Sequence, residues 1–349
     1  PTAKNAGTVS TRDRAKPKPP KTAKPKERRE RQDRPKRGEW VDLVVPPDPF
    51  VCPVPADAKT DVYVWDLDRT YLRTEFESIR DLIRTALQKA KDKVAYPGVS
   101  ALIRALRAGP DEGGAPRPIY FISASPPQIG KVIQEKFRLD RIEVDGIYFK
   151  DNLRNVRPSR LRRLKEQVGY KMLALLDLWT RLPKGARLTC FGDDAESDAL
   201  IYSLFSEVSD RWIHGPQLVE FLDKQGVFHD EAVRIAWRAR KIPRSRTVSR
   251  VFIHMHADQD PRYWRRFGTR VTATRGYFQT AFVCFADGKI SANGLADVGE
   301  EILSTRITNP YDLASAVLDL LERRVIDNAS VARAAPTLIE RKILPAGFP

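Results

Sequence analysis

Residues 62–70 read VYVWDLDRT, an apolar run that leads directly into two aspartates, Asp66 and Asp68. A short, nearly continuous apolar run rich in aromatic and β-branched residues predicts a buried strand, here over residues 61–66. The two carboxylates then stand where that strand ends. The rest of the chain decides whether they serve a common site or lie in solvent.

The segments that follow alternate between strand and helix patterns. Such alternation is typical of βαβ units, which build a parallel sheet with helices on both faces. We therefore expect an α/β, three-layer Rossmann-like fold. Apolar runs predict strands within 119–122, 141–149, 186–191 and 249–256, and helical patterns cover 75–92, 99–109, 128–137, 170–183, most of 203–245, part of 276–290 and one or two segments of 293–349.

The charge of the chain is concentrated near its beginning. The 349 residues carry a net charge of +16, and positions 1–40 hold fourteen Lys and Arg against five Asp and Glu. This segment has many prolines and almost no apolar residues, so it cannot bury enough surface to offset the entropy of ordering. We expect a disordered basic tail that either only solubilises the protein or tethers it to an anionic partner. The mild charge of the remainder does not require a nucleic-acid partner.

The cysteines and the hydropathy pattern bear on the compartment. Cys52, Cys190 and Cys284 show no CxxC spacing, which argues against a zinc knuckle or a disulfide framework. No apolar run reaches the roughly 18–20 residues that span a bilayer, and no hydrophobic core follows the charged region, so we expect no secretory signal. We expect a cytoplasmic protein, either free or peripheral to a membrane.

Polar residues follow three of the predicted strands. Asp66 and Asp68 follow the first, Ser123 ends the second, and Asp193 follows the strand within 186–191. Ligands of open parallel sheets bind at the carboxyl ends of the strands, so we expect these side chains to meet. Mg²⁺ prefers a few carboxylates, several waters and a phosphate oxygen. The pattern predicts a Mg²⁺ site beside an anion site.

The two acids of the first strand suit a two-step reaction. A carboxylate can attack phosphorus and form an aspartyl-phosphate. A second carboxylate two positions on could protonate the leaving alcohol and then activate water. One acid would attack while its neighbour handles the protons.

The motif order D-x-D-x-T, a strand ending in Ser, a Lys, and G-D-D-x-x-x-D resembles the haloacid dehalogenase-like phosphatase superfamily. More narrowly, SASP at 123–126 and GDDAESDALIY at 192–202 resemble the actin-patch-type phosphatidate phosphatase family and its bacterial relatives. The resemblance covers about residues 58–205. Within it, Arg69 lies where many relatives have Gly or Asp, and Ala124 replaces an Asn often found after the motif Ser.

The resemblance implies catalytic and metal-binding roles for the acidic residues. Asp66 matches the nucleophile and a metal ligand. Asp68 matches the acid/base, with its backbone carbonyl on the metal. Asp193 matches the main metal ligand of the last motif, supported by Asp194 or Asp198.

The resemblance also implies a phosphate-binding set. Thr70 would hold the geometry of the phosphate loop, and Ser123 matches the phosphate-binding hydroxyl, with Ser125 as the alternative. Lys171 best matches the lysine that neutralises the phosphoryl group, with Lys165 as its competitor. His254 and His256 share a face of a predicted strand, and we interpret them as core or edge histidines because no third metal ligand is evident.

These observations predict a domain plan. It comprises a basic tail over 1–40, a phosphatase domain over 41–260 with a helical insertion at about 205–247, and a mainly helical extension over 261–349 packed on that domain. The insertions after the first two motifs are roughly fifty residues each, which is short for a separate cap, so we expect little or no cap.

The predicted function is Mg²⁺-dependent hydrolysis of a phosphomonoester through an aspartyl-phosphate, on a lipid phosphate such as phosphatidate. An open site suits a bulky substrate, and a basic tail would help docking on an anionic membrane. Two alternatives stay open: a phosphatase of nucleic-acid ends or phosphoproteins, and a non-enzymatic scaffold on the same fold. The sequence does not indicate the oligomeric state.

Overall fold

The computed structural model describes residues 60–73, 94–111, 113–150, 160–195, 197–245 and 247–348, all of which belong to the unit Val41–Pro349. The predicted basic tail and the predicted helix over 75–92 lie outside these ranges, and so do the side chains of residues 160–166. The expectation of little or no cap falls partly on the same residues and stays a prediction.

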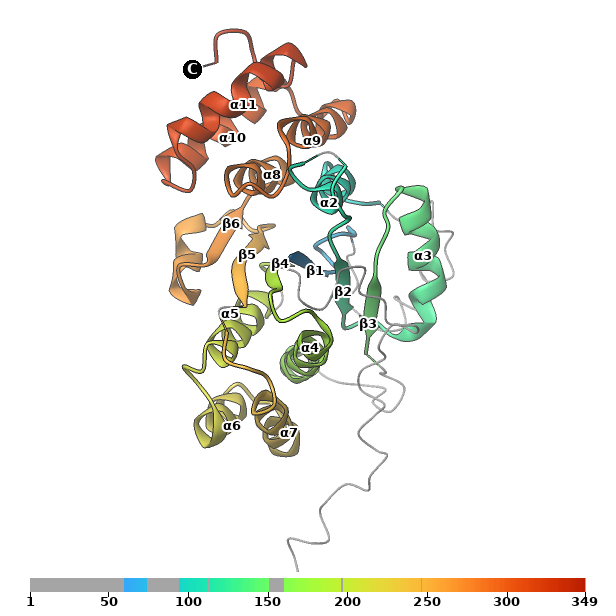
Figure 1. The fold of residues 1–349 in the computed structure, drawn as a ribbon, viewed down its shortest axis with the longest axis vertical. Helices are drawn as coiled ribbons and strands as arrows, with labels where there is room; N and C mark the ends of the chain where they lie inside the picture. The colour runs from blue at the N-terminus through green and yellow to red at the C-terminus, as the bar shows by residue number, and fades with distance from the viewer. Residues whose placement is uncertain are drawn as a thin grey trace, which may run out of the picture. The chain divides into compact units, whose positions relative to one another are not determined.

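A parallel sheet forms the centre of the described structure (Figure 1), which confirms the predicted α/β fold. Its strands lie in the order β3-β2-β1-β4-β5-β6, so β1 is flanked by β2 and β4. The strands are β1 (Asp61–Asp66), β2 (Ile119–Ser123), β3 (Gly146–Phe149), β4 (Arg187–Asp193), β5 (Val248–His254) and β6 (Val271–Thr274). The short strand β6 was not predicted from the sequence, and the predicted boundary at residue 260 falls between two strands of this one sheet.

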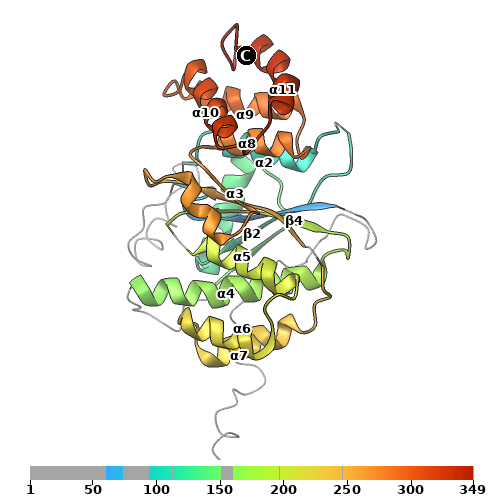
Figure 2. The same cartoon turned by 90° about the vertical axis from the view of Figure 1, so that its left-hand side faces the viewer.

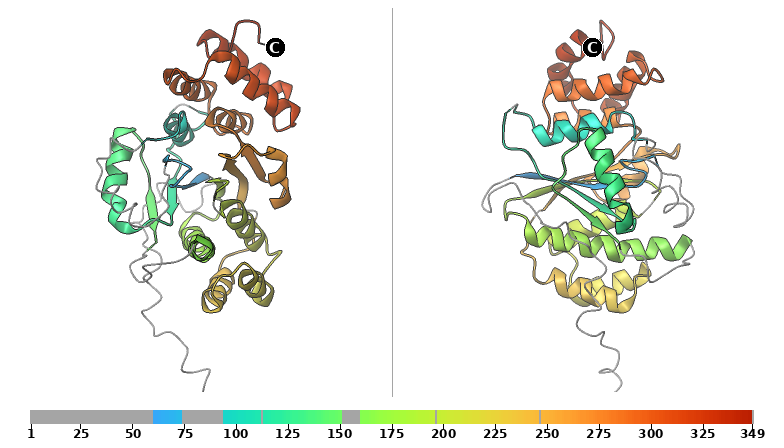
Figure 3. Two further views of the ribbon diagram at one scale, coloured as in Figure 1. Left: turned by 180° about the vertical axis from the view of Figure 1, so that it is seen from behind. Right: turned by 90° about the vertical axis from the view of Figure 1, so that its right-hand side faces the viewer.

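Helices cover both faces of the sheet, as Figure 2 shows from the side. The helices α2, α8 and α9 lie on one face, and α4 and α5 lie on the other, with α6 and α7 stacked beyond α4 (Figure 3). The helices are α2 (Val99–Ala108), α3 (Gly130–Leu139), α4 (Arg160–Arg181), α5 (Asp198–Ser209), α6 (Gly215–Lys224), α7 (His229–Ala239), α8 (Tyr277–Ala286), α9 (Ala292–Ser304), α10 (Pro310–Glu322) and α11 (Asn328–Glu340), with 3₁₀ turns η3 (Pro127–Ile129) and η4 (Pro261–Phe267).

The alternation of β1 side chains supplies both cores. Tyr63 and Trp65 point to the core shared with α2 and α8, and Val62 and Val64 point to the core shared with α4 and α5. The Trp65 ring stacks on Phe191 of β4 with centroids 3.8 Å apart, which joins the two central strands on that face. Burying an apolar side chain of this size stabilises the fold by roughly 1.5–3 kcal/mol, so Val62, Tyr63, Val64 and Trp65 anchor the strand.

The C-terminal helices share the core of the sheet. α9 packs on α2, α10 on α8, and α11 on α9, and their apolar faces belong to the same buried cluster as Trp65. Asn309 and Asp312 form a reciprocal capping box at the start of α10, with Pro310 in its first turn. Three helices follow α8, where the sequence pattern predicted one or two. Among the described residues, no helix combines the length and apolar composition needed to cross a bilayer.

Candidate active site

Three adjacent strands end in the predicted site residues. Asp66 is the last residue of β1, Ser123 of β2 and Asp193 of β4. Because β1 lies between β2 and β4 and all three run parallel, their carboxyl ends meet at one edge of the sheet. The three residues therefore stand at the ends of neighbouring strands, as the sequence predicted.

Lys171 connects the nucleophile candidate to the last motif. It lies on α4, is fully buried, and its Nζ donates to Oδ1 of Asp66 at 2.8 Å and to Oδ1 of Asp198 at 2.5 Å. Charges buried this deeply require paired partners, because desolvation of an unpaired ion is very unfavourable. The side chain of its competitor Lys165 lies outside the described residues, so the geometry assigns the ammonium beside Asp66 to Lys171.

Asp68 points toward the loop that follows β2. Its Oδ2 accepts a hydrogen bond from Ser125 Oγ at 2.7 Å and one from Ser123 Oγ at 3.3 Å. The Ser123 Oγ also accepts from the backbone N–H of Ser125 at 3.0 Å, which fixes the turn of the SASP motif. Both serines therefore contact the acid/base candidate, whereas the sequence analysis gave Ser125 only as the alternative to Ser123.

The loop after Asp68 is held through its backbone. Arg69 has a φ of 58°, a left-handed conformation that is unfavourable for a non-glycine residue and requires support from its surroundings. His256 Nε2 lies 2.8 Å from the carbonyl oxygen of Arg69, and the Tyr277 hydroxyl donates to the carbonyl oxygen of Thr70. A carbonyl only accepts, so Nε2 of His256 carries the proton and its Nδ1 faces the hydroxyl of Tyr96 at 3.3 Å.

Thr70, predicted to hold the geometry of the loop, contacts Tyr277 through its backbone carbonyl. Its side chain is buried, and its Oγ1 has no hydrogen-bond partner within the described part of the chain. The contact that holds the loop is made by its carbonyl oxygen instead, through Tyr277. Burial raises the pKa of the Tyr277 phenol, which keeps the phenol protonated as the donor.

The acids of the GDDAESD turn divide into separate roles. Asp193 is fully buried, its Oδ1 accepts from the N–H of Ala195 at 3.0 Å, and its Oδ2 lies 3.7 Å from Nε of Arg69. Asp194 Oδ2 accepts from the backbone N–H groups of His256 and Ala257, each at 3.0 Å. Asp194 therefore connects the end of β4 to the segment that follows β5.

Asp198 begins α5 and supports its neighbours. Besides its bond to Lys171, its Oδ2 lies 3.3 Å from the backbone N of Asp193. A Cβ on Gly192 would lie 2.4 Å from Oδ2 of Asp198, so the approach of Asp198 requires glycine at that position. Of the two supporting ligands that the resemblance implied, Asp198 is engaged with Lys171 and Asp194 with backbone amides.

The oxygen atoms of the acidic residues at the strand ends are of the kind that binds Mg²⁺. Across the described residues, no group of three or more His, Cys, Asp or Glu side chains lies close enough to hold a metal ion. Mg²⁺ does not require such a cage, because it is commonly bound by one or two carboxylates and keeps several waters. Asp66, Asp193 and the carbonyl of Asp68 provide hard oxygen donors of this kind, so the donor set fits the ion.

The histidines near the edge are uncharged. Desolvation, with the neighbouring His256 and Arg73, lowers the pKa of His254 to about 3, and desolvation also lowers the pKa of His256. The ring of His254 stacks on Tyr277 at 4.6 Å between centroids. Their interpretation as core and edge residues holds for His254, which is buried, whereas His256 positions the Arg69 loop.

The part of the chain that carries these strand ends matches a known protein family. Residues 62–215 match the family model described as phosphatidate phosphatase APP1, catalytic domain. The match confirms, over these residues, the family resemblance that the SASP and GDDAESDALIY motifs indicated. It includes every strand-end residue described above and ends before β5 and β6. No curated protein and no solved structure gives a significant match.

The APP1-type segment does not contain all residues that shape the site. His256 and Tyr277, which hold the loop after Asp68, lie beyond residue 215. Sequence reasoning missed their contact with the loop, because only the packing of β5 and α8 brings them there. The one available signal was the pair of histidines at the end of a predicted strand.

Proposed function

We propose that this chain is a Mg²⁺-dependent phosphomonoester hydrolase of the haloacid dehalogenase type that acts on a lipid phosphate such as phosphatidate. The observation that carries the proposal is the buried Lys171 ammonium beside Asp66, next to an Asp68 carboxyl that both SASP serines hydrogen-bond. The family described as phosphatidate phosphatase supports the choice of substrate.

In the first step, a carboxylate oxygen of Asp66 attacks phosphorus. A phosphorus–oxygen bond to Asp66 forms, the ester bond to the alcohol breaks, and Asp68 gives its proton to the departing oxygen. Lys171 stabilises the negative charge that Asp66 and the phosphoryl oxygens bring together. Ser123 and Ser125 orient Asp68 toward the leaving group.

In the second step, water displaces Asp66 from phosphorus. Asp68 takes a proton from the water while the water oxygen bonds to phosphorus. The bond between phosphorus and Asp66 breaks, and inorganic phosphate leaves. Asp66, Asp193 and the carbonyl of Asp68 would hold Mg²⁺. When bound, the ion supplies positive charge that offsets the repulsion between these acids and the phosphate.

The test is phosphate release from phosphatidate in mixed micelles, with and without Mg²⁺, by wild type and by Asp66→Asn. Parallel reactions contain a soluble aryl phosphate and a 5′-phosphorylated oligonucleotide. We expect Mg²⁺-dependent release from phosphatidate that is absent in the variant. Release that persists in Asp66→Asn would refute the nucleophile, and a preference for the oligonucleotide would refute the lipid substrate.

A further inference from the structure

A cavity lies directly against the loop that follows Asp68. It has a volume of about 650 Å³, and its lining includes His256 and Tyr277, the two side chains that hold the carbonyls of Arg69 and Thr70. This size falls in the range of pockets that bind small organic ligands. The cavity is therefore adjacent to the loop of the proposed reaction and large enough for the organic part of a substrate.

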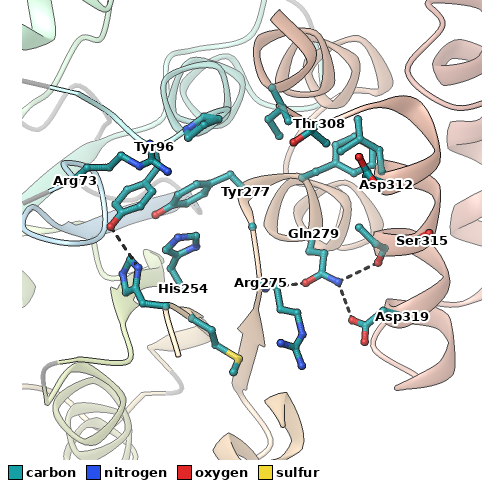
Figure 4. A pocket seen from close by; sticks show the side chains of 18 residues that line it. Arg73, Tyr96, His254, Arg275, Tyr277, Gln279, Thr308, Asp312, Ser315 and Asp319 are labelled. Carbon is teal, nitrogen blue, oxygen red and sulfur yellow. Dashed lines mark hydrogen bonds between the residues drawn. The ribbon is translucent and has the colours of Figure 1, made fainter. Parts of the chain in front are cut away.

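The two ends of the cavity differ in chemistry. Figure 4 shows Arg73 and Tyr96 on the side of the catalytic loop, and Thr308, Asp312, Ser315 and Asp319 on the opposite side. At the near end, Arg73 lies over the Tyr96 ring at 5.4 Å, so a cation lines the cavity on the side of the catalytic loop. The near end of the cavity therefore carries positive charge, which favours an anionic ligand.

Apolar side chains also line the cavity, next to the polar residues on the side farther from the catalytic loop. Phe278 of α8, Ile302 of α9 and Leu313 of α10 are buried side chains that line the cavity, and Ala316 adds a small side chain from α10. Hydrogen bonds from Gln279 to the Ala316 carbonyl and to Asp319 fix α10 against α8. Because the burial of apolar surface is favourable, these apolar side chains offer a surface on which a hydrocarbon chain can pack.

The outer rim carries exposed apolar side chains. Ile307 is 81% exposed and Tyr311 is 72% exposed, and each directly precedes a lining residue, Thr308 and Asp312. Asp312 and Ser315 are themselves exposed, so the cavity reaches the surface at this rim. Exposed apolar side chains therefore lie next to the opening of the cavity, where a hydrocarbon chain that leaves it would pass.

We propose that this cavity binds the acyl-ester part of a glycerolipid phosphomonoester, with the phosphate at Asp66 and the chain along Phe278, Ile302 and Leu313. This assignment rests on the proposed phosphatase function and deepens it, because it locates the selection for an acylated alcohol. A cavity of this size takes the glycerol esters and the first part of the chains, and the remainder passes the rim at Ile307 and Tyr311.

The test compares soluble substrates of increasing chain length. Glycerol 3-phosphate and dibutyryl, dihexanoyl and dioctanoyl phosphatidate are assayed below micelle-forming concentrations with wild type. Each methylene that becomes buried raises kcat/KM about fourfold until the cavity is full. Equal kcat/KM for all chain lengths, with turnover present, would overturn the assignment and leave the phosphatase function standing.

Variants on one helix locate the effect. Ala316→Trp fills the cavity, and Leu318→Trp adds the same ring on an exposed position of α10 outside the lining. We expect Ala316→Trp to lower kcat/KM for dihexanoyl phosphatidate at least tenfold and to leave an aryl phosphate within twofold, with Leu318→Trp unchanged on both. Ser315→Trp, at the exposed rim, serves the same purpose if Ala316→Trp does not fold. Preserved chain-length preference in the filled variants would overturn the assignment.

A binding measurement separates the two proposals. Asp66→Asn is titrated calorimetrically with dihexanoyl phosphatidate and with glycerol 3-phosphate, alone and combined with Ala316→Trp. Tighter binding of the acylated ligand that Ala316→Trp removes supports the cavity even if no ester is hydrolysed. Equal binding of both ligands refutes it, whatever the catalytic assay gives.

Discussion

Lys171 and Asp66 form a fully buried ion pair, with Nζ 2.8 Å from Oδ1, although 105 residues separate them in the chain. The pair joins helix α4 to the end of strand β1. With Asp198 on the other side of the ammonium, two carboxylates share one cation in the interior. The stability of the fold and the chemistry at Asp66 therefore depend on the same side chain.

Replacing Lys171 by Met should both inactivate and destabilise the protein. The substitution leaves two buried carboxylates without their shared cation, which typically lowers the free energy of unfolding by about 3–5 kcal/mol. Urea denaturation in EDTA measures the loss. The double variant Lys171→Met, Asp198→Asn should recover part of that stability but no phosphatase activity. Equal stability of wild type and Lys171→Met would contradict the buried pair.

Replacing Asp68 by Asn should separate the two chemical steps. With an aryl phosphate, the leaving phenolate needs little protonation, so the first step proceeds while attack by water loses its base. We expect a burst of about one equivalent of phenol followed by turnover slowed by about 10²–10⁴-fold, seen in stopped flow. Ser125→Ala, which only loosens the Asp68 carboxyl, should give a much smaller reduction. A variant with linear kinetics at the wild-type rate would exclude Asp68 as the base.

Asp193 and Asp194 are neighbours that should respond differently to substitution. Asp193→Asn should raise the Mg²⁺ concentration needed for half-maximal activity by tenfold or more, because it removes a ligand charge. Asp194→Ala should leave that concentration unchanged and lower the unfolding free energy by about 1–2 kcal/mol, because the amides of His256 and Ala257 lose their acceptor. Mg²⁺ titrations and thermal melts distinguish the two variants. If Asp194→Ala raised the Mg²⁺ requirement and Asp193→Asn did not, the roles of the two residues would be exchanged.

His254 should make stability depend on pH. Its folded pKa of about 3 lies below the ordinary value near 6.5, so the unfolded chain binds more protons between these values. The contribution of the neutral His254 to the free energy of unfolding is therefore fully present above about pH 6.5 and is lost progressively as the pH falls toward 3. Relative to His254→Phe, which keeps a ring beside Tyr277, wild type should lose roughly 1–2 kcal/mol between pH 7.5 and pH 5.

Denaturant titrations in EDTA at several pH values measure that difference. His214→Gln, at an exposed position, is the control and should follow wild type. A profile for His254→Phe as steep as that of wild type would place the pH dependence elsewhere.

The central part of the fold could be predicted because its signals are local. β1, β2 and β4 are buried on both faces and therefore read as continuous apolar runs, each ending in a polar residue. That pattern was enough to bring Asp66, Ser123 and Asp193 to one edge. Strand β6 escaped prediction because its four residues, VTAT, are short and follow an Arg-rich 3₁₀ turn.

The finer assignment of the site could not be predicted, because it depends on packing between distant segments. Asp194 and Asp198 both lie close after Asp193 in sequence, and only the position of β5 beside β4 shows which one meets backbone amides. Likewise, Tyr277 contacts Thr70 across 207 positions, a relationship that no local pattern records.

The position of β5, β6 and the last helices beyond residue 215 has a consequence for the design of shortened variants. A fragment ending at residue 215, where the family match ends, would leave β4 as an open sheet edge and expose the face that α8 and α9 cover. Unpaired edges and large apolar faces promote aggregation. We therefore expect the smallest piece that folds to extend at least through the C-terminal helices, and in a shorter deletion variant a loss of the proposed activity would report misfolding.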